Sequence, residues 1–354
     1  MNAPNEVRTM LVESVNRLLG DHVDQKMLEA AKRDGWSAAL WQALEDAQAT
    51  LIATPEESGG AGGVLSDLAA VLRVAGRHTA PVPLAETAML AAWMLVSAGL
   101  PVPRAPLAAG PAGAEVIRAR RQGDRWVVSG AIPRMPWARV AHQLVLLAES
   151  DAGGVIVSVD PARCEIRPGH NLAGEPRDVV ELRDVIAEAA APAANVTRSA
   201  LKTRGALARA LLMAGALERA LELAVGYAQQ RVQFGRRIGQ FQAIQQELAR
   251  FAGEVAAAVA AALSAAGVME RGGDVTLAVA SAKIRTAEAA RAGALIAHQV
   301  HGAIGVTDEY PLHHATLRLW SWREEYGNEA DWALTLGALA HKRGADQLWP
   351  ALTN

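Results

Sequence analysis

The sequence predicts an α+β protein, because a β-rich segment lies between two long helical regions. Residues 1–100 and 193–354 carry apolar residues at the spacing of amphipathic helices. Residues 101–192 instead contain short β-branched or apolar runs separated by Gly, Pro and Asp. We therefore expect an N-terminal all-α domain over 1–100, a small middle β-barrel or sandwich domain over 101–192 and a C-terminal helical bundle over 193–354.

The N-terminal region contains amphipathic segments joined by a glycine-rich loop. Leu11, Val15 and Leu18 lie on one face of a helix. The segment Pro55–Gly63, PEESGGAGG, holds four glycines and a proline, a composition that a helix cannot hold. A further helix is expected to begin at Pro83, because Pro is favoured in the first turn of a helix.

The middle and C-terminal regions differ in their side chains. The runs WVVSG, HQLVLLAE, GGVIVSVD and DVVEL have the β-branched composition of strands. From about Leu201 the chain becomes rich in alanine, and residues 207–228 predict one long helix. Similar alanine-rich segments follow, and small residues let helices approach closely. Three or four such helices predict a bundle.

The stretch Tyr227–Arg250 predicts the end of one helix, a tight turn at Phe234-Gly235 and the start of the next helix. Three arginines surround the turn, namely Arg231, Arg236 and Arg237. A cationic turn with an aromatic ring and nearby glutamine amides suits a phosphate group and a flat base. A solvated corner between two helices is the alternative.

Composition excludes several classes of function. The formal net charge is -2, which gives no electrostatic reason to expect nucleic acid or an anionic membrane surface as a partner. The single cysteine, Cys164, cannot form an internal disulfide and fits a reducing compartment. Charges interrupt the apolar stretches, so we expect a cytoplasmic protein without a membrane span. His313 and His314 are adjacent and cannot share a helix face, so we expect no metal site.

Three segments resemble the signatures of one enzyme family. RVQFGRRIGQFQAIQQELA, at 231–249, resembles the signature segment of the acyl-CoA dehydrogenases, which are FAD-dependent flavoproteins. QVHGAIGVTDEYPLHH, at 299–314, resembles their second C-terminal signature, and PEESGGAGG matches an N-terminal one. The three matches occur in the family's order and span most of the chain. The resemblance implies the acyl-CoA dehydrogenase fold, with a C-terminal four-helix bundle.

The resemblance also implies a cofactor site. Family members remove hydrogens from the α and β carbons of an acyl-CoA thioester, and electron-transfer flavoprotein accepts the electrons. The first signature reaches across a subunit boundary to the partner's FAD, which implies an oligomer. Carried over to this chain, Arg231 would pair with the pyrophosphate, while Phe234 and Gln242 would lie near the adenosine. Gln299 and Gly302 would approach the same dinucleotide through backbone groups.

Two departures from the family pattern concern the flavin ring and the base. The expected Thr-Glu-Pro loop is absent, because residues 105–126 contain no threonine or serine. The family's catalytic Glu before a Gly aligns with Tyr326, so Glu325 stands one residue early, and a shift of one residue turns a helical side chain by about 100°. The family's second base position falls near Ala208-Arg209, where there is no carboxylate. Glu325 is the first candidate base, Glu329 is the second and Glu324 is a further local candidate. For each of them, a solvated or salt-bridged carboxylate beside Arg323 is the alternative.

Two functions therefore stay open. The chain resembles either a working FAD-dependent acyl-CoA dehydrogenase with Glu325 as its base, or a base-less subunit. In the second case it would complete the FAD site of a different, catalytic acyl-CoA dehydrogenase chain, and it resembles the short, degenerate chains that form such mixed assemblies. A helical interaction protein without flavin is a third reading, which the three ordered signatures argue against.

Overall fold

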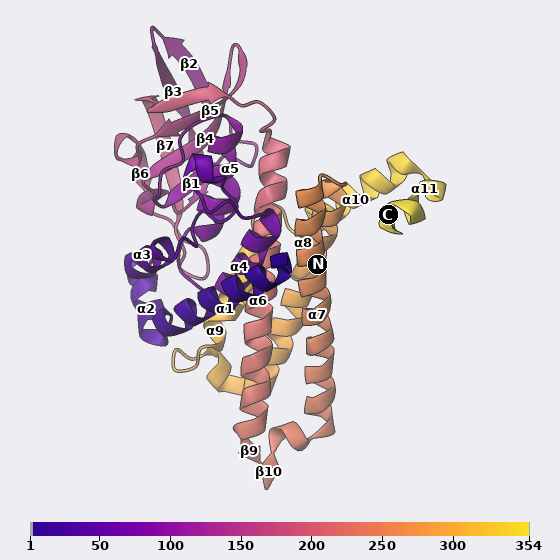
Figure 1. Ribbon diagram of the computed structural model, residues 1–354. Coiled ribbons are helices and arrows are strands. Elements are labelled where there is room, and N and C mark those ends of the chain that lie inside the picture. Colours follow the sequence, from indigo (N-terminus) through magenta and orange to yellow (C-terminus); the bar gives the residue numbers. More distant parts are fainter. Residues whose placement is uncertain (1–2, 354) are drawn as a thin grey trace.

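A mixed β-sheet lies at one end of the molecule, and the N-terminal helices pack directly against a C-terminal bundle of long helices (Figure 1). The structure is a computed structural model that describes residues 3–353. One apolar core joins the N-terminal helices to the bundle, and a second core fills the interior of the β segment. The α+β prediction is confirmed.

The N-terminal helices pack on the bundle through α4. A side-chain oxygen of Asp24 caps α2 by accepting from the Met27 N–H at 2.7 Å. The glycine-rich segment forms a short 3-10 turn and then a loop. At Gly60 this loop passes so close to the backbone of Thr54 that a side chain could not fit. The helical elements are α1 (Ala3–His22), α2 (Gln25–Asp34), α3 (Ala38–Asp46), η1 (Glu56–Ser58), α4 (Leu65–Arg77), the π-helical η2 (Glu86–Ala91) and α5 (Ala92–Ser97).

The β segment is one sheet with the order β6-β7-β3-β2-β4-β5-β8, and β1 pairs in parallel with β4. Its interior side chains, such as Val128, Leu144 and Val157, are fully buried. Short 3-10 turns, η3 (Ala138–Val140) and η4 (Pro161–Arg163), connect strands. The strands are β1 (Leu107–Gly110), β2 (Arg118–Gln122), β3 (Arg125–Pro136), β4 (Gln143–Ser150), β5 (Gly153–Val159), β6 (Glu165–Arg167), β7 (Arg177–Ile186) and β8 (Ala189–Pro192).

The bundle is built around α6, a helix of 33 residues that starts beside the sheet and ends at the far tip of the molecule (Figure 1). Thr197 caps its N-terminus. The helix α7 is long and apolar enough to cross a membrane by length and composition alone, but it packs on α6 and α8 as a bundle helix. The helices are α6 (Arg198–Gln230), α7 (Gln242–Arg271), α8 (Val275–His301), α9 (Leu312–Glu324), α10 (Glu329–Arg343) and α11 (Ala345–Thr353).

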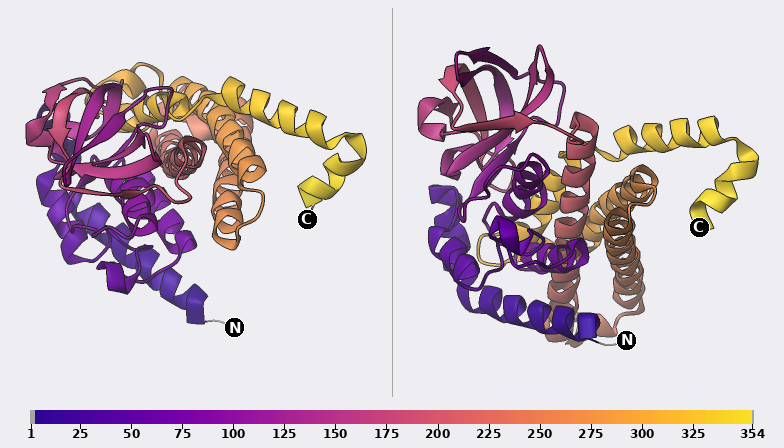
Figure 2. Two further views of the ribbon diagram at one scale, coloured as in Figure 1. Left: turned by 90° about the horizontal axis from the view of Figure 1, so that it is seen from above. Right: turned by 45° about the horizontal axis from the view of Figure 1, so that its top comes forward.

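Shorter elements join these helices. The predicted turn between α6 and α7 is a hairpin of β9 (Val232–Gln233) and β10 (Arg236–Arg237), followed by the 3-10 turn η5 (Ile238–Gln240). A second 3-10 turn, η6 (Gly302–Val306), follows α8. The helices α10 and α11 project from the body of the molecule (Figure 2).

Buried Lys283 holds the end of α9. Its Nζ donates to the carbonyl oxygens of Trp322, at 3.2 Å, and Arg323, at 2.6 Å. These carbonyls belong to the last turn of α9, where the usual backbone partners run out, and the Trp322 carbonyl also accepts from the Glu325 N–H at 3.3 Å. Because burial disfavours the charged amine, the pKa of Lys283 is lowered to about 7.

The close contact between α4 and α6 predicts the effect of a substitution at Gly215. A methyl group on Gly215 would overlap the carbonyl oxygen of Arg73, so Gly215→Ala is expected to lower the free energy of unfolding by about 1–3 kcal/mol. Gly226 lies on the same helix with open space around it. Gly226→Ala is therefore the control, and it is expected to raise stability by up to about 1 kcal/mol. Equal unfolding midpoints in denaturant for the two variants would contradict the contact.

Lys283 predicts a pH dependence of stability. Above about pH 7 the folded protein releases this proton, while the unfolded chain keeps it up to about pH 10.5. The unfolded state binds more protons in this window, so the stability of the wild type should rise with pH relative to Lys283→Met, by at most about 1.4 kcal/mol per pH unit. The measurement is denaturant unfolding of both proteins at pH 7 and pH 9. A constant difference between them would contradict the depressed pKa.

Candidate functional site

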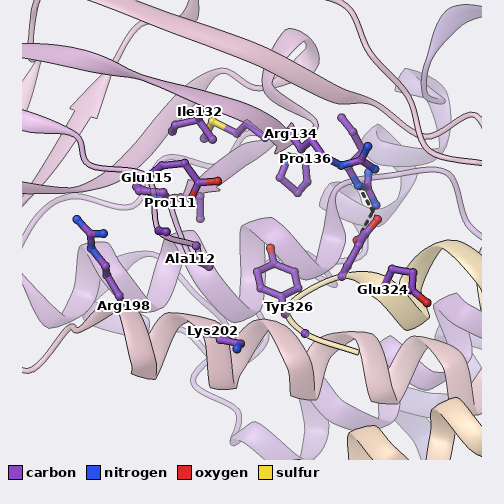
Figure 3. Close-up of a pocket in the computed structure, with 18 of the residues that line it drawn as sticks. Pro111, Ala112, Glu115, Ile132, Arg134, Pro136, Arg198, Lys202, Glu324 and Tyr326 are labelled. Carbon is purple, nitrogen blue, oxygen red and sulfur yellow. Dashed lines mark hydrogen bonds and ion pairs between the residues drawn. The ribbon is translucent and has the colours of Figure 1, made fainter. Parts of the chain in front are cut away.

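A pocket of about 870 Å³ lies between the sheet and the start of α6 (Figure 3). We call it the interdomain pocket. The loop after β1, the end of β3, the first turn of α6 and the turn between α9 and α10 form its walls. The lining residues are Ala109–Glu115, Ile132, Arg134–Pro136, Arg177, Arg198, Ser199, Lys202, Ser321, Glu324–Gly327 and Asp331.

The turn between α9 and α10 brings Glu325 and Tyr326 to this pocket. Tyr326 has the left-handed φ of 58°, which is unfavourable for a bulky side chain. Its ring lies on Gly205 of α6, where a methyl group would overlap it. Figure 3 shows the phenol of Tyr326 pointing into the pocket between the loop of Ala112 and Lys202.

Both carboxylate oxygens of Glu325 are occupied. Arg177 donates from Nε to Oε1 at 2.7 Å and from Nη2 to Oε2 at 3.0 Å. Arg209 donates from Nε to Oε2 at 2.6 Å, and the Asn171 amide donates to Oε1 at 3.3 Å. The side chain of Glu325 is 13% exposed.

These partners determine the ionisation of Glu325. Burial alone would raise its pKa, but the charges and hydrogen bonds of Arg177 and Arg209 outweigh burial and lower the pKa to about 2. A general base works best when its pKa lies near the working pH and an oxygen can reach the proton. The pKa of Glu325 lies far below neutral pH, and its oxygens are engaged with Arg177 and Arg209.

Glu325 belongs to a larger group of buried charges that we call the charged cluster. Arg209 also pairs with Glu86 of η2, and Arg177 pairs with Glu175 at 3.1 Å. Glu175 in turn pairs with Arg318 at 3.2 Å and accepts from the indole of Trp322 at 2.9 Å. The members of the cluster are Glu86, Glu175, Arg177, Arg209, Arg318 and Glu325.

The other two candidate carboxylates differ in their surroundings, because Glu324 lines the pocket and Glu329 is paired with an arginine. Glu324 lines the pocket and is exposed to solvent, where the amide of Asn328 donates to it at 3.4 Å. Glu329 accepts from Arg323 Nε at 3.0 Å, and this hydrogen bonding lowers its pKa. Glu329 is therefore a salt-bridged carboxylate, as the alternative interpretation predicts.

The residues carried over for the dinucleotide lie at the opposite end of α6. We call the segment from Arg231 to Gln242 the hairpin tip. Phe234 occupies the turn of β9 and β10 with a φ of 52° and is 92% exposed. The ring of Phe234 lies edge-on to the ring of Phe241. The guanidinium carbon of Arg236 lies 4.1 Å from the centre of the Phe241 ring. Arg231, Arg236, Arg237 and Gln242 are all exposed.

The second signature meets the first at this end of the bundle. The ring of His301, the last residue of α8, stacks on Tyr227 of α6 with centroids 4.6 Å apart. Gln299 and Gly302 are exposed beside this stack, and Gly302 has a φ of 64° with open space around it. The structure therefore gathers Arg231, Phe234, Gln242, Gln299 and Gly302 at one end of the bundle.

Glu325 is not among them. The pocket contacts α6 at Arg198–Lys202, whereas Arg231 follows the last residue of α6. With a rise of about 1.5 Å per residue, Lys202 and Gln230 are about 42 Å apart. One chain therefore presents its pocket and its hairpin tip in two separate places.

The sequence did not reveal the partners of Glu325. Arg177, Arg209 and Glu86 are far from it along the chain, and no local pattern joins them. A signal does exist for two of them, because Glu86 and Arg209 are single charges within long apolar helical runs. A charge in such a place is rarely buried without a partner.

Comparisons with known proteins show the family. The model of the acyl-CoA dehydrogenase N-terminal domain matches residues 5–104, and that of the acyl-CoA dehydrogenase C-terminal domain matches residues 195–328. The chain is 33% identical over 316 residues to acyl-CoA dehydrogenase IpdE2 of Mycobacterium tuberculosis, covering 88% of this chain and 90% of that protein.

Solved structures agree with this result. The ChsE4-ChsE5 complex from Mycobacterium tuberculosis contains a chain that superimposes with a TM-score of 0.87 and 25% identity, covering 96% of this chain and 98% of that chain. A glutaryl-coenzyme A dehydrogenase superimposes with a TM-score of 0.85 at 22% identity, covering 94% and 95%, and shows the shared fold. The chain therefore belongs to the acyl-CoA dehydrogenase family of FAD-dependent oxidoreductases.

Proposed function

We propose that this chain is a non-catalytic partner subunit in a mixed acyl-CoA dehydrogenase assembly. Its hairpin tip would complete the FAD site of a second, catalytic chain. The observation that carries the proposal is the state of Glu325, whose oxygens are held by Arg177 and Arg209. A structural neighbour of this chain comes from the ChsE4-ChsE5 complex, and this supports a mixed assembly.

The side chains of the interdomain pocket do not fit a flavin ring. Its β wall is formed by small and apolar residues, and Pro111 and Pro136 lack the backbone N–H that could donate to a ring carbonyl or nitrogen. The polar side chains that the β wall offers are the carboxylate of Glu115 and the guanidinium groups of Arg134 and Arg177, and Arg177 is already paired with Glu175 and Glu325. This donor set supports the idea that the chain serves a cofactor held elsewhere.

The hairpin tip does fit a dinucleotide. Arg231 would bind a phosphate oxygen, Phe234 would lie against the adenosine and Gln242 would donate or accept a hydrogen bond there. When bound, FAD would be the hydride acceptor of the reaction, and the partner chain would supply the base. Because the tip lies about 42 Å from the chain's own pocket, its natural target is a site on a neighbouring chain.

A self-sufficient dehydrogenase is the second candidate, because Glu325 does line the interdomain pocket. In that case Arg177 and Arg209 would have to release the carboxylate when substrate binds. Electron-transfer flavoprotein would accept the electrons in either case.

Replacing Arg231 tests the role of the tip. In the co-purified assembly, Arg231→Ala should weaken FAD binding by about 10–100-fold, since a hydrogen bond to a charged group contributes about 1.5–3 kcal/mol. The readout is FAD retained per assembly and its dissociation constant. Arg237→Ala removes a neighbouring exposed charge and should change affinity less than about twofold. Unchanged FAD affinity in Arg231→Ala would contradict the proposal, as would full, substrate-reducible flavin in the chain purified alone.

Replacing Glu325 separates the two candidates. In a partner subunit, Glu325→Gln should leave the rate of anaerobic flavin bleaching by acyl-CoA unchanged in the assembly isolated by gel filtration. It should nevertheless lower the chain's stability by about 3–5 kcal/mol, because Arg177 and Arg209 lose a buried counter-charge. Glu324→Gln, at the exposed neighbour, should change neither property. A fall in the bleaching rate of more than about 100-fold in Glu325→Gln alone would identify a catalytic base instead.

A further inference from the structure

We infer that the charged cluster and Tyr326 form a plug that closes the inner end of the interdomain pocket against an acyl chain. This inference deepens the proposed function, on which it rests. It states why the chain would not accept an acyl-CoA of its own, independently of whether a base is present.

The pocket ends where the plug begins. Arg177, Glu325 and Tyr326 line the pocket and contact the buried part of the cluster, and Figure 3 shows the ring of Tyr326 among the lining residues. Behind them, Glu86 and Arg209 are each 1% exposed. The remaining space beside these two side chains has a volume of about 10 Å³, which is at most enough for one water molecule.

The cluster contains equal numbers of positive and negative side chains, and they come from the N-terminal helices, the β segment and the bundle. Glu86 belongs to the N-terminal helices, Glu175 and Arg177 to the β segment, and Arg209, Arg318 and Glu325 to the bundle. The three carboxylates and three guanidinium groups are joined by ion pairs. A member that moved away would leave an uncompensated buried charge. The plug is therefore a fixed part of the fold and not a side chain that can swing aside.

Tyr326 adds an aromatic face to the plug. Its ring lies 5.3 Å from the guanidinium carbon of Arg209 and packs on Gly205. The left-handed backbone places the ring between the pocket and Arg209, and the contacts on both sides hold it there.

The test compares a short and a long thioester by isothermal titration calorimetry. The probes are acetyl-CoA and octanoyl-CoA, which share the CoA moiety and differ in the length of the acyl chain. The wild type should show no preference between them. The pair Glu86→Ala/Arg209→Ala removes one carboxylate and one guanidinium, so the rest of the cluster stays balanced, and it should bind octanoyl-CoA at least about tenfold more tightly than acetyl-CoA.

Two further variants make the result decisive. Glu86→Gln/Arg209→Met removes the charges but keeps the volume, so it should stay without preference. Tyr326→Gly removes the ring at a φ that suits glycine, so this variant should fold and should also favour octanoyl-CoA. Melting curves show which variants are folded.

A wild type that prefers octanoyl-CoA by about tenfold or more would overturn the plug. So would folded cavity variants that show no preference. Neither result involves FAD, and in that event a loss of FAD in the Arg231→Ala assembly would still support the partner role. The two proposals therefore fail separately.

Discussion

The double pairing of Arg209, to Glu86 on one side and to Glu325 on the other, is the interaction on which the centre of this molecule depends. It joins a helix of the N-terminal layer to the turn after α9, and Arg177 extends the link to the sheet. Six buried charges are costly to desolvate, and such groups are tolerated when each has a partner of opposite sign. These ion pairs therefore fix the positions of the N-terminal helices, the sheet and the bundle relative to one another.

The same interaction changes the chemical character of Glu325. A carboxylate that lines a pocket in a dehydrogenase is a candidate base, but here two guanidinium groups lower its pKa to about 2 and so make it a weak base. Its neighbour Tyr326, which the resemblance aligns with the family's usual acid, lines the same pocket. The oxygens of Glu325 thus take part in ion pairs that join separate parts of the fold, while Arg231 and Phe234 are exposed at the hairpin tip.

Much of the fold could be predicted from local patterns. Helical spacing indicated α6, the PEESGGAGG loop followed from its glycines, and the turn at Phe234-Gly235 followed from the permissive backbone of glycine. The partners of Glu325 could not be predicted in this way, because Arg177 lies 148 residues away and Arg209 lies 116 residues away along the chain. Ion pairs between layers depend on how the layers dock, and residue spacing carries no information about docking. Resemblance predicted the tip residues as a cofactor site, which stays a prediction, and it could not show that the tip and the pocket are at opposite ends of one helix.

The length of α6 has a consequence for how such chains can change over evolution. A single inserted residue in a straight helix would rotate everything beyond it by about 100° and displace it by about 1.5 Å. In a protein that works alone, surface loops could absorb such a change. If α6 sets both the position and the angle of the tip relative to a neighbouring chain, an insertion or deletion within its 33 residues would misplace the tip on that chain. The length of α6 would then be conserved because of a binding surface on another protein chain.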